Sequence, residues 1–118
     1  MRYMSLYKPG YETTDLPTAE EMAAMGSLIE EMSKAGTLIE TGGLEHSKTG
    51  FRVEKNGPKV TVTDGPFAEA KEVIGGYAIL EAKNREHAVA LARQFLDVAG
   101  AGVCEIRPMH QACDFASV

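Results

Sequence analysis

Two segments with helical periodicity, each flanked by strand-like segments, constrain the fold of this chain most strongly. The first covers residues 16–36, where Thr18 is expected to cap the helix and Glu21 to complete a capping box. Gly36 follows the last turn, a position where glycine commonly ends a helix. Apolar side chains recur at helical spacing and predict a buried stripe, which consists of Met22, Met25, Ile29 and Met32, with Leu28 beside it.

The second helical segment covers residues 84–100, and Asn84 is its expected N-cap. Its buried stripe is predicted at Ala88, Leu91, Ala92 and Phe95. Strand-like segments precede and follow the helices at residues 3–7, 37–44, 75–82 and 103–109. This order predicts one α+β domain over residues 1–118, a ferredoxin-like βαβ(hairpin)βαβ fold with both helices on one face of an antiparallel sheet.

A β-hairpin is predicted between the two βαβ units, because Asn56-Gly57 separates two segments with alternating apolar residues. A turn centred on Asn56-Gly57 would place Val53 opposite Val60 and Phe51 opposite Val62. It would also pair Glu54 with Lys59 on the other face. Pro58 lacks a backbone N–H, so we expect a looser tip than an ideal two-residue turn.

The first and last strands suggest which side chains face the helices. Alternation places Met4 and Leu6 on one face of the first strand, and we expect this face to lie under the helices, together with Cys104 and Ile106 of the last strand. The opposite face would carry Tyr3, Ser5, Tyr7, Glu105 and Arg107. Aromatic side chains on an open sheet favour a partner. We therefore expect a homodimer that closes over a partly polar pocket.

The segment VTDGPFAEAKEVIGGYAI (residues 62–79) places turn residues and charges between two strands. Gly65 and Pro66 are typical of a turn. Asp64, Lys71 and Glu72 could join Glu105 and Arg107 in one cleft over the open sheet face. Carboxylates and cations that converge on such a cleft are typical of a binding or catalytic site. The alternative interpretation is a solvated charge pair where the loop meets the next strand.

Charge and composition exclude several classes of function. A net charge of −5 with scattered basic residues argues against nucleic-acid binding. No apolar stretch approaches the length of a membrane span, and the N-terminal residues lack the features of a signal peptide, so a cytoplasmic protein is expected. Cys104 and Cys113 form no recognisable metal motif with His110, and neither a metal nor a cofactor is expected.

The segment around Asp64 resembles the signature of the DGPF type of YCII-related proteins. MRYMSLYK also resembles the opening strand of that family, and EIRPMHQACDF its closing strand and tail. The resemblance implies a dimeric α+β barrel, in which paired sheets enclose a cleft. Relatives in the broader superfamily include isomerases and dehalogenases that act on small aromatic-derived or lactone substrates.

The resemblance also bears on the candidate catalytic residues. Typical YCII proteins carry a His-Asp pair with the histidine shortly after the first strand, but this chain reads YKPGYETTD there. Asp64 alone matches, as the aspartate of the motif. His46, His87 and His110 lie elsewhere, and His46 could reach the rim of a cleft.

Two functions follow as hypotheses. The first is an enzyme without a cofactor, in which Asp64 acts as acid or base on a small anionic molecule. Its binding residues would be Arg107, Lys71, Glu72, Glu105 and Tyr3. The second is a non-catalytic module that uses the same cleft for a ligand or a protein partner.

Overall fold

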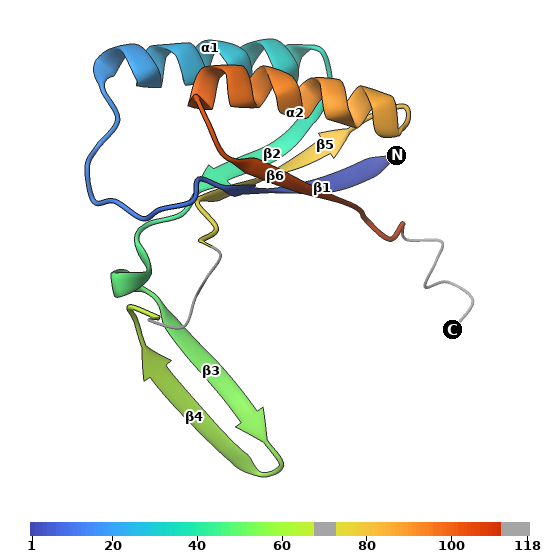
Figure 1. Ribbon diagram of the computed structural model, residues 1–118. Coiled ribbons are helices and arrows are strands. Elements are labelled where there is room, and N and C mark those ends of the chain that lie inside the picture. The colour runs from blue at the N-terminus through green and yellow to red at the C-terminus, as the bar shows by residue number, and fades with distance from the viewer. Residues whose placement is uncertain (68–72, 112–118) are drawn as a thin grey trace.

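A computed structural model gives the structure of the chain and describes residues 1–67 and 73–111. The elements are β1 (Arg2–Lys8), α1 (Ala19–Lys34), β2 (Leu38–Gly43), the 3-10 turn η1 (Ser47–Thr49), β3 (Phe51–Asn56), β4 (Lys59–Asp64), β5 (Gly76–Glu81), α2 (Arg85–Ala99) and β6 (Val103–Pro108). Four strands form one antiparallel sheet in the order β2-β5-β1-β6. Both helices cover one face of this sheet, and β3 and β4 form a separate hairpin that projects from it (Figure 1). The predicted ferredoxin-like arrangement is confirmed.

The helix ends agree with the sequence signals. Thr18 caps α1, accepts a hydrogen bond from the backbone nitrogen of Glu21, and completes the capping box with it. Gly36 follows the helix with a φ of 78°, a conformation that favours glycine. Asn84 caps α2 by accepting a hydrogen bond from the backbone nitrogen of His87. None of the helices in the described part of the chain is long and apolar enough to span a membrane.

The core lies between the helices and the sheet. The buried residues that form it are Tyr3, Leu28, Met32, Leu38, Leu80, Ala82, Ala88 and Leu91. Met25, Ile29 and Phe95 pack against this cluster as partly buried side chains. The predicted stripe of α2 is thus confirmed, whereas Met22 of the α1 stripe is 61% exposed and does not belong to the core.

The predicted orientation of β1 is wrong. Tyr3 and Ser5 are only 7% and 6% exposed, and both face the helices. The pairing of β1 with β6 requires this, because Ser5 lies opposite Ile106, and residues that lie opposite each other share a face. The tyrosine rings bury large apolar surfaces while their hydroxyl groups reach the edge of the core, where that of Tyr7 donates to the carbonyl oxygen of Ala101 at 2.6 Å.

The open face of the sheet is consequently more aliphatic than expected. Met4 pairs with Ile79 and Leu6 pairs with Tyr77, and all four side chains are partly buried on the face away from the helices. Glu105 and Arg107 lie opposite Leu6 and Met4 on this same face, as the sequence predicts. Cys104 and Ile106 lie on the covered face, also as predicted.

The hairpin forms where it is predicted, but its register differs by two residues. Val53 lies opposite Val62 and Phe51 opposite Asp64, so the pairs Val53–Val60, Phe51–Val62 and Glu54–Lys59 are wrong. The loop is Gly57-Pro58, with Gly57 at a φ of 61°, which suits a two-residue turn that needs no N–H from Pro58. The apolar side chains still share one face, and they are between 58% and 66% exposed: Phe51, Val53, Val60 and Val62.

Candidate functional site

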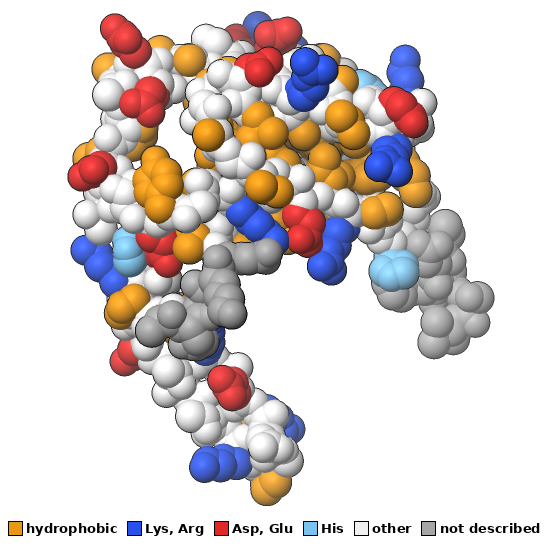
Figure 2. Space-filling view, viewed as in Figure 1, with side chains coloured by type: hydrophobic (Ala, Val, Ile, Leu, Met, Phe, Trp, Pro, Cys, Tyr) orange, Lys and Arg blue, Asp and Glu red, His pale blue; other side chains and the backbone are white. Residues whose placement is uncertain are grey.

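A cavity of about 670 Å³ lies where the hairpin meets the sheet. We call it the polar cavity. Its walls come from the β1–α1 loop, from the segment between β2 and η1, from the base of the hairpin and from the residues before β5. Charged side chains of both signs gather in this part of the molecule (Figure 2). The side chains that matter for its chemistry are Tyr11, Glu12, His46, Ser47, Arg52 and Phe67.

The carboxylate of Glu12 is fixed by Ser47. The backbone nitrogen of Ser47 donates to Oε2 at 2.6 Å, and its hydroxyl donates to Oε1 at 2.8 Å. These two hydrogen bonds, with the nearby His46, hold the pKa of Glu12 below its usual value of 4.5, although partial burial opposes them. Glu12 is therefore a carboxylate near neutral pH, and both of its oxygens have defined partners.

His46 stands next to this carboxylate. Its Nδ1 lies 3.0 Å from Oε2 of Glu12 and 3.0 Å from the backbone nitrogen of Lys48. The side chains of His46 and Glu12 are only 24% and 18% exposed. The backbone N–H of Lys48 donates to Nδ1, so Nδ1 is an acceptor in this structure, and a neutral imidazole then carries its proton on Nε2. A move of that proton to Nδ1, toward Oε2 of Glu12, would leave Nε2 as the nitrogen that accepts a proton.

The turn that carries His46 and Ser47 is held by the DGPF motif. The backbone nitrogen of Gly65 donates to the carbonyl oxygen of Gly50 at 2.9 Å, which joins the end of β4 to the end of η1. A Cβ atom at residue 65 would overlap the carbonyl oxygen of Ser47, so this close approach requires glycine. Through these backbone contacts, the motif holds the turn that carries His46 and Ser47, and Ser47 holds Glu12.

Phe67 of the same motif reaches the cavity wall. The guanidinium group of Arg52, on β3, lies 3.9 Å from the centre of the Phe67 ring, which is cation–π geometry. Both residues line the polar cavity. Three carboxylates also line it, those of Glu12, Asp15 and Glu45, so acidic groups outnumber the single guanidinium among the described lining residues.

The predicted site residues do not gather at this cavity. Asp64 ends β4 at an exposed position and does not belong to the described lining of the cavity. Lys71 and Glu72 lie outside the described residues. Tyr3 is a core residue beneath the helices, so the expectation that it faces an open cleft is wrong.

Glu105 and Arg107 do form a pair, on β6 at the edge of the sheet. Nε of Arg107 lies 2.9 Å from Oε2 of Glu105, and Nζ of Lys8 lies 3.0 Å from Oε1. Hydrogen bonding and charge from Lys8, and then from Arg107, hold the pKa of Glu105 below 4.5. The Arg107 side chain is 75% exposed, which is typical of a surface ion pair of small energetic weight.

Sequence reasoning missed Glu12 and Ser47. Glu12 stands in a loop with no periodic pattern, and 33 residues separate it from His46 along the chain. The site could have been inferred from the order of the strands. β1 and β2 both pair antiparallel with β5, so the loops that follow them lie at the same end of the sheet. In the described part of the chain, no group of three histidine, cysteine or acidic residues is arranged to hold a metal ion.

The model of the YCII-related domain family matches residues 1–112. No curated protein matches the chain. Among solved structures, 5-chloro-2-hydroxyhydroquinone dehydrochlorinase from Burkholderia phenoliruptrix AC1100, in complex with 2,5-dihydroxybenzoquinone, is similar with a TM-score of 0.52. The two sequences are 13% identical, and the match covers 97% of this chain and 98% of the other. At this identity the likeness shows the fold.

Proposed function

Because the chain belongs to the YCII-related domain family, we propose that it binds a small organic molecule in the polar cavity and transfers a proton on it without a cofactor. The observation that carries this proposal is the Glu12–His46 pair, with 3.0 Å between Oε2 and Nδ1. A carboxylate that orients an imidazole is a common arrangement for a general base. His46 takes this role, in place of the Asp64 that the motif suggests.

The proposed step removes a proton from a carbon next to a carbonyl group, or from a phenol. In the reactive form that we propose, the imidazole proton lies on Nδ1, toward Oε2 of Glu12, in place of the hydrogen bond from the Lys48 backbone. Nε2 of His46 then accepts the substrate proton, and the electrons of the C–H or O–H bond move toward the substrate oxygen. Arg52 supplies a positive charge on the described part of the wall, which offsets the resulting oxyanion. Return of the proton to another carbon completes an isomerisation, and loss of a leaving group from the enolate completes an elimination.

The charge of the cavity decides the substrate class. Among the described residues that line it there are three carboxylates and one guanidinium, and such a wall disfavours a molecule that arrives as an anion. We therefore propose a neutral phenol or enolisable ketone, which becomes negative only during the reaction. The solved relative that holds 2,5-dihydroxybenzoquinone supports a ring compound of this kind, although it shares only 13% identity with this chain.

The test is a screen for solvent deuterium exchange, read by proton NMR, with cyclic 1,3-diketones and substituted hydroquinones in D2O. The protein should exchange at least one of these compounds faster than buffer. Glu12→Gln should then lower that rate by about two orders of magnitude, at the lower end of the range for an acid–base group. Glu54→Gln, which removes an exposed carboxylate from the hairpin, is the matched control. Equal rates for the two variants would contradict the proposal.

A second candidate is a protein-interaction module without catalysis. The observation in its favour is the exposed apolar face of the hairpin, since an isolated two-stranded hairpin is only marginally stable in water. Under this alternative, no compound would exchange above the buffer rate, and Val62→Lys would abolish binding of the partner. The exchange screen therefore separates the two candidates.

We also propose that the chain is a homodimer through the open face of the sheet. Met4, Leu6, Ile79 and Tyr77 supply the apolar surface that a second copy would cover. The barrel-forming dimers that the family resemblance implies agree with this arrangement.

A further inference from the structure

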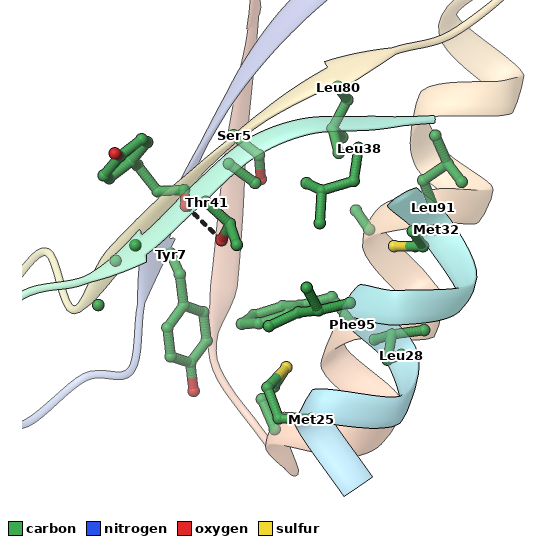
Figure 3. Close-up of a pocket in the computed structure, with 18 of the residues that line it drawn as sticks. Ser5, Tyr7, Met25, Leu28, Met32, Leu38, Thr41, Leu80, Leu91 and Phe95 are labelled. Carbon is green, nitrogen blue, oxygen red and sulfur yellow. Dashed lines mark hydrogen bonds between the residues drawn. The ribbon is translucent and has the colours of Figure 1, made fainter. Parts of the chain in front are cut away.

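A second cavity, of about 480 Å³, lies between the sheet and the two helices. We call it the apolar cavity. Figure 3 shows its walls, with Leu38 and Leu80 on the sheet side and Met25, Leu28 and Phe95 on the helix side. Apolar side chains are also visible at the surface between the helices and the sheet (Figure 2).

The polar groups on its wall have partners already. The Tyr7 hydroxyl donates to the carbonyl oxygen of Ala101 at 2.6 Å, and Oγ1 of Thr41 donates to the carbonyl oxygen of Tyr77 at 2.8 Å. A ligand would therefore find few hydrogen-bonding groups here. Apolar cavities as small as about 150 Å³ stay dry and take up benzene. This cavity suits an apolar ring or a short alkyl chain.

The two cavities meet at Tyr7, which together with Gly75 lines both. The Tyr7 ring stands edge-on to Phe95, with 4.9 Å between ring centres. A Cβ atom at Gly102 would come within 2.7 Å of this ring, so the close approach of the backbone to Tyr7 there requires glycine. Tyr7 thus lies at the boundary between the two spaces, at the edge of the apolar cavity in Figure 3.

We infer that the two cavities form one binding site with two compartments. This inference rests on the proposed function, because it takes the reacting part of the ligand to lie at the Glu12–His46 pair. The apolar cavity holds an apolar substituent of the same molecule, and Tyr7 sets how that substituent passes from one compartment to the other. The ligand class is accordingly a phenol or enolisable ring ketone with an alkyl or aryl substituent.

The experiment measures the affinity of phenol, 4-ethylphenol, 4-propylphenol and 4-butylphenol by isothermal titration calorimetry. Burial of each methylene in an apolar site should raise the affinity about fourfold. Ala78→Leu places extra volume on the sheet side of the apolar cavity. It should reduce the gain in affinity per added methylene, while phenol itself still binds. Ala90→Leu adds the same volume at an exposed position of α2 and should leave the increase unchanged.

Methyl NMR of the unmodified protein provides a second readout, which does not depend on the folding of a variant. Met25 and Met32 line the apolar cavity, whereas Met22 is exposed. 4-Butylphenol should shift the Met25 and Met32 signals and leave that of Met22 in place. The inference would be overturned if affinity did not rise with the length of the alkyl substituent. It would also be overturned if Ala78→Leu left that rise unchanged.

These outcomes are separable from failure of the proposed function. If His46→Asn leaves phenol binding unchanged while the chain-length increase persists, the apolar cavity binds ligands but the catalytic pair does not take part. If His46→Asn weakens phenol binding and chain length has no effect, the polar cavity alone is the site and the two-compartment inference is wrong.

Discussion

The backbone of Gly65 lies directly against the carbonyl group of Ser47, so closely that no side chain fits at residue 65. Ser47 in turn holds the Glu12 carboxylate with two hydrogen bonds. The glycine of the DGPF motif therefore acts on the candidate site through the position of a turn. This relationship explains why the motif can matter for function although Asp64 itself does not line the polar cavity.

Gly65→Ala should destabilise the protein. The new Cβ atom must displace the Ser47 carbonyl, and overpacking of this kind costs about 1–3 kcal/mol of unfolding free energy. Gly26→Ala is the matched control, because Gly26 is exposed in α1 and a Cβ atom there meets nothing within 4 Å. It should stabilise the protein by about 0.5–1 kcal/mol through helix propensity. Urea unfolding of both variants measures the difference, and equal effects would refute the steric account.

The Glu12 carboxylate should contribute to stability in a pH-dependent way. Its pKa is lowered in the folded state, so its contribution is present above pH 4.5 and is lost as the pH falls through the folded-state pKa. Glu12→Gln should therefore lower the melting temperature at pH 7, and the gap from wild type should shrink below pH 4.5. Thermal melts from pH 7 to pH 3 test this, with Glu54→Gln as the control. A gap that widens toward acid would contradict the assigned pKa direction.

The proposed dimer makes a prediction about the open face of the sheet. Leu6→Glu places a charge among Met4, Ile79 and Tyr77 and should shift the protein from dimer to monomer at micromolar concentration. Val89→Glu places the same charge at an exposed position of α2, away from that face, and should leave the dimer intact. Sedimentation velocity gives the masses. A wild-type protein that sediments as a monomer would remove the basis for the proposal.

The parts of the fold that sequence predicts well are those with local signals. The capping box of Thr18 and Glu21, the glycine at residue 36 and the stripe of α2 each depend on neighbouring residues, and all are confirmed. Alternation along β1 separates its two faces correctly, but alternation alone does not say which face the helices cover. That choice depends on the register between Ser5 and Ile106, which is a tertiary property.

The candidate site was harder to predict for the same reason. Glu12 and His46 come from loops whose conformations depend on the Ser47 turn and on the backbone contact with Gly65. Nothing in the residues around Glu12 indicates a partner so far along the chain. The predicted hairpin register was wrong because the turn was centred on Asn56-Gly57. Pro58 fits the second loop position once Gly57 adopts its positive φ, so the loop is Gly57-Pro58.

In the proposed reaction, His46 moves the proton while Glu12 orients its imidazole. The most direct measurement is kcat/KM for deuterium exchange into the best compound of the screen, with His46→Gln and Asp64→Asn compared side by side. We expect kcat/KM to fall by about two to four orders of magnitude for His46→Gln and to change by less than about threefold for Asp64→Asn. A large loss for Asp64→Asn with an active His46→Gln would contradict this expectation and return the catalytic role to Asp64.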